Sequence, residues 1–178
     1  MFEVRRAGTE DFTTIKELYK KVAAIPGGIA RNISEITDDY IKGFMNRSAT
    51  HGIELVVTLP GKKEEVIAEI HCYTPGIEKF SHVLDELTIA VAPDFQGKGI
   101  GKLIFTELLS QIEKEKLHIL RVELFTQESN IRAISFYKQL GFKEEGRFEN
   151  KIKMDGDQLE ADIPMAWFNK NYKSSIAL

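Results

Sequence analysis

Residues 87–109 read LTIAVAPDFQGKGIGKLIFTELL, and this stretch decides the fold. Its first five residues are apolar and partly β-branched, which predicts a buried strand. Ala92-Pro93-Asp94 ends that strand, and residues 96–101, QGKGIG, lead directly into an amphipathic helix. Glycines at alternate positions leave the amides of the helix start uncovered. Because these amides carry the positive end of the helix dipole, the stretch predicts a phosphate site.

The spacing of the glycines excludes two common phosphate loops. A dinucleotide fingerprint would need glycine where Lys102 or Ile104 stands, and a P-loop would need glycine at Gln96 and a hydroxyl residue at Leu103. The pattern that fits is Gln-x-x-Gly-x-Gly after a strand. It resembles the pyrophosphate loop of the GNAT family of N-acetyltransferases, which hold acetyl-coenzyme A there. The alternative is a helix start whose glycines serve only close packing.

A second motif carries the same resemblance. Residues 130–142 read NIRAISFYKQLGF, which is similar to the N-x-x-A-x-x-F-Y-x-x-x-G-F segment of that family. The two motifs lie on consecutive strand–helix units, as they do in the family. The resemblance covers residues 2–167 and is weakest over 25–80. The chain is therefore identified as a member of the GNAT family.

The resemblance implies how the coenzyme is held. Parallel strands near Ile89 and Leu124 would splay into a slot, where the pantetheine arm pairs with a strand edge and the pyrophosphate meets the loop amides. Asn130 would contact the pantetheine arm. A purely structural role for Asn130, as the cap of the following helix, is an alternative of equal weight. The cofactor-binding residues expected on this basis are Ile89, Ala90, Val91, Gln96, Gly97, Lys98, Gly99, Ile100, Gly101, Lys102, Asn130 and Tyr137.

The resemblance makes Tyr137 the catalytic acid that protonates the departing thiolate. A phenol suits this role because it carries its proton at neutral pH. The alternative is a core aromatic on an amphipathic helix, but Phe136 and Leu140 suffice for that core. The polar tip of Tyr137 therefore favours a function.

The acceptor amine must be neutral to attack, so a base or a water relay is needed. Residues 80–86 are similar to a segment of polyamine-acetylating relatives, and this resemblance makes Glu86 the predicted catalytic base. Asp85, which matches a carboxylate of some histone-modifying relatives, His82 and a water relay remain open. Adjacent strand residues face opposite ways, so only one of the two carboxylates points at the acetyl group. The alternative for all three side chains is a solvated strand entrance. Cys72 is read as core filler, which favours direct transfer.

Composition narrows the class of protein. The chain has 178 residues, of which 43% are hydrophobic and 29% charged, with a net charge of -3 and one cysteine. These values predict one soluble domain over 1–172 with a frayed tail at 173–178, no disulfide, no metal site and no nucleic-acid partner. No apolar leader or span is evident, so a cytoplasmic location without a membrane partner is expected. A homodimer is left open.

The expected fold class is α/β (α+β), a mixed and mostly antiparallel sheet of about seven strands with helices on both faces. The predicted order is β-α-α-β-β-β-α-β-α-β-β, with a central parallel pair. Hydrophobic periodicity places helices at 10–24, from Ser34 to Ser48, at 98–116 and at 130–140. The third helix is expected to bury Leu103, Ile104, Leu108, Leu109 and Ile112. Strands are expected at 2–6, 53–59, 65–73, 80–91 and 118–126. Two last strands follow, one over 142–147 and 151–154 and the other over 159–168, with turns at 60–63 and 155–157.

The predicted function is direct transfer of acetyl from acetyl-CoA, without a metal, to a primary amine of a small molecule or protein N-terminus. Residues 141–167 resemble the ends of acetyltransferases that act on ribosomal-protein N-termini, amino acids and polyamines. Two alternatives stand beside it, namely an acyl-CoA-binding regulatory module without turnover and a polyamine-specific acetyltransferase. Five carboxylates could attract a cationic amine, namely Glu35, Asp38, Asp39, Asp85 and Glu86. For those on the helix, a solvated surface is the favoured alternative.

Overall fold

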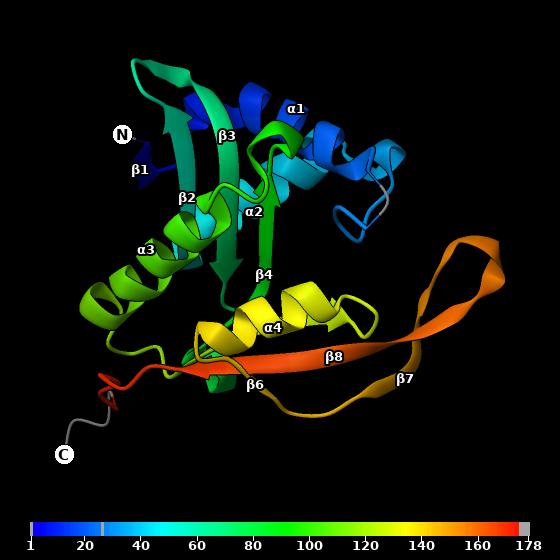
Figure 1. Cartoon of the computed structure of the whole chain (residues 1–178). Coiled ribbons are helices and arrows are strands. Elements are labelled where there is room, and N and C mark those ends of the chain that lie inside the picture. The colour runs from blue at the N-terminus through cyan, green and yellow to red at the C-terminus, as the bar shows by residue number, and fades with distance from the viewer. Residues whose placement is uncertain (1, 26, 175–178) are drawn as a thin grey trace. The chain divides into compact units, whose positions relative to one another are not determined.

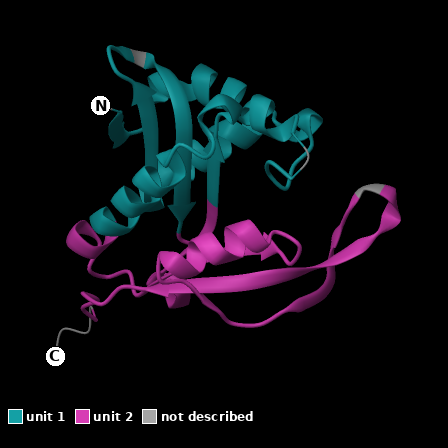
Figure 2. Ribbon diagram, viewed as in Figure 1, with its two compact units in different colours: residues 1–73, 88–111 teal, residues 74–87, 112–178 magenta. Residues whose placement is uncertain are grey.

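The computed structural model describes residues 2–25 and 27–174, so residues 175–178 of the predicted tail lie outside it. The described residues form four α-helices and eight strands, mixed in direction and mostly antiparallel, which confirms the predicted fold class. The chain divides into two compact units (Figure 2). Unit 1 comprises residues 1–73 and 88–111, and unit 2 comprises residues 74–87 and 112–178. Strand β4 and helix α3 run from one unit into the other.

The strands of unit 1 follow one another in the order β1-β2-β3-β4. They are β1 (Glu3–Arg6), β2 (Gly52–Leu59), β3 (Lys62–Tyr73) and the second half of β4 (Val83–Val91). β1 pairs antiparallel with β2, and β2 with β3. The β2–β3 turn is Pro60-Gly61 alone, with Gly61 at φ 76°, so the predicted turn at 60–63 was too long. A glycine is needed here because a two-residue hairpin uses left-handed backbone.

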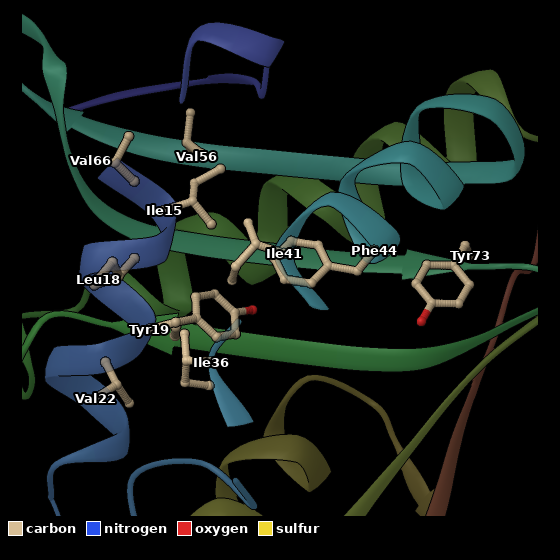
Figure 3. Packing of buried hydrophobic residues seen from close by; sticks show 11 residues of the cluster. Ile15, Leu18, Tyr19, Val22, Ile36, Ile41, Phe44, Val56, Val66 and Tyr73 are labelled. Atoms are coloured by element: carbon tan, nitrogen blue, oxygen red, sulfur yellow. The ribbon is translucent and has the colours of Figure 1, made fainter. Parts of the chain in front are cut away.

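Helices cover both faces of this sheet. In Figure 1, α1 (Phe12–Ala23) and α2 (Asp38–His51) lie behind β2 and β3, whereas α3 (Ile100–Glu115) crosses in front. The side chains of β4 alternate accordingly. Ala90 belongs to the same buried cluster as Tyr19 of α1 and Phe44 of α2, whose side chains are labelled in Figure 3. On the other face, Ile89 and Val91 lie 3.9 Å from the position that a Cβ on Gly101 of α3 would take.

Two helix predictions need correction. The second helix begins at Asp38, because the Thr37 hydroxyl accepts a hydrogen bond from the Tyr40 amide at 3.2 Å and caps it there. Ser34 lies instead in a separate 3₁₀ helix, Ile33–Glu35. In α3, Leu103 is 40% exposed and Phe105 is fully buried, so the buried stripe runs through Phe105. The other four predicted members of that stripe are buried.

Unit 2 is built around β8 (Leu159–Phe168). On one side β8 pairs antiparallel with all of β5 (Arg121–Gln127), and on the other with β6 (Lys143–Glu144) and β7 (Phe148–Lys153). The first half of β4 pairs parallel with β5 at two positions, Val83↔Arg121 and Leu84↔Val122, which confirms the predicted parallel pair. The strand expected at 142–147 is only two residues long. Helix α4 (Ile131–Gln139) runs along β8 in Figure 1.

Candidate functional site

The glycine-rich turn of unit 1 has the backbone conformation that an anion site needs. Gly97 and Gly99 adopt φ angles of 73° and 82°, in the left-handed region that other residues avoid. A Cβ at either position would meet nothing within 4 Å, so the backbone angle rather than crowding requires glycine. Left-handed residues alternating with others turn successive amides toward a concave side, which is how backbone nests bind phosphates. Helix α3 begins directly after them, at Ile100.

The turn is anchored to unit 1 at both ends. Ile100 is 2% exposed, and the Leu103 amide donates to the Gly99 carbonyl at 3.0 Å, which starts the helix ladder. On the other side, the Gln96 side-chain amide donates to the Val91 carbonyl at 3.1 Å. Gln96 therefore clamps the turn to the end of β4. This contact gives a physical reason for glutamine at the start of the motif.

Two lysines bring positive charge to the turn. Lys98 and Lys102 are both exposed, and the Lys98 ammonium lies 5.4 Å from the centre of the Phe95 ring. The three predicted strand residues beside them lie in the β4 segment of unit 1, with Ala90 fully buried and Ile89 and Val91 half-buried. The structure thus brings the predicted residues of 89–91 and 96–102 together. The donors present, main-chain amides and ammonium groups, fit a diphosphate.

In unit 2, Asn130 and Tyr137 lie at the two ends of α4. The Asn130 side chain caps the helix by accepting from the Ala133 amide at 3.1 Å, which confirms its cap reading. Tyr137 is half-buried against Phe136 and Phe142, with ring centres 5.6 Å and 6.0 Å away. Burial raises the pKa of Tyr137 to about 12, so the hydroxyl keeps its proton at neutral pH.

The predicted base, Glu86, has a strained backbone. It is exposed and adopts φ 53° inside β4, a left-handed angle that non-glycine residues take at an energetic cost of roughly 1–3 kcal/mol. Its neighbour Asp85 is half-buried. His82 contributes its main chain to the unit 2 sheet, because its carbonyl accepts from the Leu120 amide at 2.8 Å. Strain of this kind is concentrated at functional sites, which supports Glu86 over its two neighbours.

Comparison with known proteins settles the family. The family model described as acetyltransferase (GNAT) family matches residues 33–142, which is more than half of the chain. The chain belongs to the GNAT family. The glycine-rich turn and the Asn130–Phe142 segment both lie within the matched region.

Among curated proteins, this GNAT chain is similar to the [ribosomal protein bS18]-alanine N-acetyltransferase of Escherichia coli K12. The two are 42% identical over 65 residues, which is 35% of this chain and 43% of the relative. An N-acetyltransferase of Methanocaldococcus jannaschii is 38% identical over 66 residues, 37% of this chain and 28% of the relative. The chain thus matches less than half the length of these relatives.

Solved structures extend the likeness in fold to the whole GNAT chain. A GNAT acetyltransferase from Streptococcus pneumoniae has a TM-score of 0.83 at 18% identity, covering 94% of this chain and 99% of the other. The Salmonella typhimurium protein yncA, solved with its cofactor acetyl-CoA, has a TM-score of 0.81 at 17% identity and covers 99% of both chains. The Escherichia coli ribosomal-protein-S18-alanine N-acetyltransferase has a TM-score of 0.74 at 22% identity, covering 100% and 99%.

A buried polar cluster in unit 1 was missed from the sequence. Tyr19 of α1 lies with its hydroxyl 2.5 Å from the Glu69 carboxyl, whose other oxygen lies 3.0 Å from Nδ1 of His71. Glu54 stands opposite His71 in the β2–β3 pairing, and the Phe44 ring of α2 stacks on His71 at 4.0 Å. All four polar residues are at most 7% exposed. The alternation of inward-facing and outward-facing residues along β2 and β3 could have revealed this cluster, because Glu54, Glu69 and His71 stand at inward positions.

Burial controls the protonation of this cluster. Loss of hydration, together with the neighbouring Glu69, raises the pKa of Glu54 to about 8. Burial likewise raises the pKa of the Glu69 carboxyl and of the Tyr19 hydroxyl well above their usual ranges. Glu54 therefore carries a proton at neutral pH. The cluster links α1 and α2 to the sheet, and burial favours the protonated forms of its two carboxyl groups and its phenol.

Among the residues that the structure describes, no helix combines the length and the apolar character of a membrane span. The same residues contain no group of three or more histidine, cysteine, aspartate or glutamate side chains placed to hold a metal ion.

Proposed function

We propose that this GNAT chain is an acetyl-CoA-dependent N-acetyltransferase that transfers acetyl directly to a primary amine. The observation that carries the proposal is the glycine-rich turn, where two left-handed glycines precede a helix. One exposed lysine lies between these glycines and a second lies in the first turn of the helix. The diphosphate of the coenzyme would accept hydrogen bonds from the amides of residues 97–102. The family and the acetyl-CoA held by the yncA structure of similar fold support this choice of donor.

The thioester of acetyl-CoA supplies the electrophilic carbonyl. The acceptor amine must lose a proton before it attacks, and the Glu86 carboxylate is proposed to take it. Because Glu86 is exposed, the proton can pass on to solvent. The neutral amine then bonds to the carbonyl carbon, and the carbon–sulfur bond breaks as the amide forms. Residues 89–91 of unit 1 are proposed to pair with the pantetheine arm during this step. Asn130 of unit 2 keeps its predicted role as a coenzyme contact.

Tyr137 is proposed to act on the sulfur that leaves. With a pKa of about 12, the phenol is a weaker acid than a thiol, whose pKa is roughly 8.5. Full proton transfer to a free thiolate is therefore uphill by more than three pK units. We expect Tyr137 to donate a hydrogen bond to the sulfur as negative charge develops, with solvent supplying the final proton. A buried hydroxyl suits this task because it is never ionised near neutral pH.

The acceptor is proposed to be a small-molecule amine or a protein N-terminus. The curated Escherichia coli relative is named for a ribosomal protein alanine, and its match covers only part of either chain. The test is a panel of polyamines, amino acids, N-terminal peptides and aminoglycosides, with release of free thiol from acetyl-CoA as the readout. Thiol release that depends on one amine class supports the proposal.

The same panel separates the alternative of a regulatory module without turnover. Such a module would bind acetyl-CoA in calorimetry but release no thiol above background with any amine. Release without formation of an acetylated amine would indicate hydrolysis instead. Either result would contradict the proposed transfer.

A further inference from the structure

The surface of unit 2 holds an ammonium group of its own between two aromatic rings. The Lys151 ammonium lies 4.1 Å from the centre of the Phe125 ring and 4.7 Å from that of Phe148. It also lies 2.9 Å from a carboxylate oxygen of Asp162. The two ring centres are 6.0 Å apart. We call Phe125, Phe148 and Asp162 the ammonium cage.

Strand pairing places the cage residues on one face of the sheet. Asp162 of β8 stands opposite Gln127 of β5 on one side and opposite Phe148 of β7 on the other. Residues paired in this way point to the same face, and Phe125 lies two positions before Gln127, so it shares that face. The cage is therefore fixed by three neighbouring strands (β7 and β8 are labelled in Figure 1).

A bulge in β7 brings Lys151 over the cage. Phe148 pairs with Asp162 and Ile152 with Glu160, so three residues of β7 stand opposite one residue of β8. Within the bulge, Asn150 adopts φ 52°, a left-handed angle that asparagine tolerates better than most residues. Bulges re-aim side chains and are frequent next to functional sites. Lys151 thus reaches the cage through an irregularity and not through regular alternation.

The chemistry of the cage is that of an alkylammonium site. Aromatic faces attract an ammonium through their quadrupoles, and a carboxylate adds a charge-assisted hydrogen bond. The Asp162 carboxyl is only 9% exposed, so it needs a cation beside it, whereas the Lys151 side chain is 45% exposed on a flexible stem. Both rings are 45% exposed, so a second ammonium can reach their faces once Lys151 swings away.

We propose that Phe125, Phe148 and Asp162 bind one ammonium end of a di- or polyamine, and that Lys151 occupies this site until the ligand displaces it. The proposal rests on the proposed function and narrows its acceptor to amines that carry a second cationic group. Such an amine would gain affinity from the cage that a monoamine of the same size would not. Lys151 then acts as an internal competitor that weakens binding of small monoamines.

Binding of spermidine, measured by calorimetry without acetyl-CoA, tests the cage directly. We expect Lys151→Met to bind spermidine about tenfold more tightly than wild type, because the competitor is gone. Lys153→Met is the matched control, because it removes the same charge from the same strand but breaks an exposed ion pair with Asp157 and no contact with the cage among the described residues. We expect the control to change the affinity less than twofold.

Substitution of either aromatic ring in the Lys151→Met background should weaken spermidine binding, which is the opposite of the effect expected for Lys151→Met itself. Phe125→Leu and Phe148→Leu should each weaken spermidine binding by roughly three- to fivefold, the usual size of one exposed cation–π contact. A neutral probe, 1,8-octanediol, should not bind to any variant. Both rings are exposed, so these variants should fold, and melting curves check this.

Equal affinity of Lys151→Met and Lys153→Met, or ring variants that bind as tightly as their parent, would overturn the cage. So would an absence of spermidine binding in both wild type and Lys151→Met. Failure of the proposed function looks different, because spermidine would still bind with the expected pattern while no thiol is released from acetyl-CoA. Thiol release with monoamines alone would support the proposed transferase activity and contradict the proposed role of the cage.

Discussion

The two units handle charge and hydrogen bonding in opposite ways. Unit 1 presents main-chain amides at its exposed glycine-rich turn and keeps Glu54, Glu69 and His71 inside its core. Unit 2 carries its chemistry on single side chains, with Tyr137 half-buried and Glu86 and the cage rings exposed. Different substitutions should therefore disable each unit. Coenzyme binding by main-chain amides should be lost when the turn changes its conformation. A catalytic role of a side chain should be lost when its reactive atom is removed.

The largest effect should come from the buried cluster of unit 1, through stability. The pKa of Glu54 is about 8 in the folded protein and 4.5 in the unfolded chain. Its contribution to the free energy of unfolding is therefore fully present below pH 4.5, where the carboxyl group is protonated in both the folded and the unfolded state. That contribution is lost progressively as the pH rises from 4.5 to 8, by up to about 5 kcal/mol. Glu54→Gln should therefore be more stable than wild type at pH 8 and similar at pH 4.5, as measured by urea unfolding.

Glu65→Gln is the control for this effect, because Glu65 is exposed and pairs with Lys62 on the surface. Its unfolding free energy should follow wild type across the same pH range. If the unfolding free energy of Glu54→Gln also follows wild type across this range, then Glu54 does not hold its proton in the folded protein. The contrast between protonated carboxyl groups inside unit 1 and charged side chains on the surface of unit 2 would then not stand.

Next in size is the loss of coenzyme binding in Gly99→Glu. A side chain at φ 82° strains the turn, and a carboxylate repels the diphosphate. We expect the affinity for coenzyme A to fall roughly 100-fold or more, measured by calorimetry. Gly61→Glu is the matched control, since Gly61 has φ 76° and open space around it in the β2–β3 turn of the same unit. Unchanged affinity in Gly99→Glu would remove the turn as the phosphate site.

Tyr137→Phe should separate chemistry from binding. Removing the hydroxyl leaves the ring contacts with Phe136 and Phe142 in place, so coenzyme affinity should stay within twofold of wild type. The turnover number should fall about 100-fold, the usual scale for loss of a general acid or its hydrogen bond. Tyr172→Phe serves as the control hydroxyl. A turnover equal to wild type would leave Tyr137 as a packing residue.

The smallest of these effects is expected for Glu86→Gln. An exposed carboxylate can be replaced in part by water, so we expect turnover to fall only about tenfold. The loss should shrink at high pH, where the amine arrives already neutral. The measurement is a pH–rate profile, with Glu78→Gln as an exposed control in unit 2. A profile that overlays wild type would transfer the role of base to Asp85, His82 or water.

Local sequence signals predicted the parts of the fold that depend on neighbours in the chain. The glycine-rich turn, the Asn130 cap and strand β8 follow from spacing within about ten residues, and the structure has them where they were expected. The start of α2 was misplaced because Ser34 and Thr37 are both good caps. Only the fold around them selects Thr37.

Groups brought together from distant positions could not be predicted in the same way. Tyr19 and Glu69 are separated by 50 residues, and their contact depends on how α1 packs on β3. Lys151 reaches Phe125 through a bulge whose register no local pattern encodes. Glu86 was selected from the resemblance, whereas its left-handed backbone became visible only in the structure.

A crystal structure of the protein with acetyl-CoA would show whether main-chain amides hold the diphosphate. We expect diphosphate oxygens within about 3 Å of the main-chain nitrogens of residues 97–102. A diphosphate ordered elsewhere on the chain, or no bound coenzyme at saturating concentration, would contradict it.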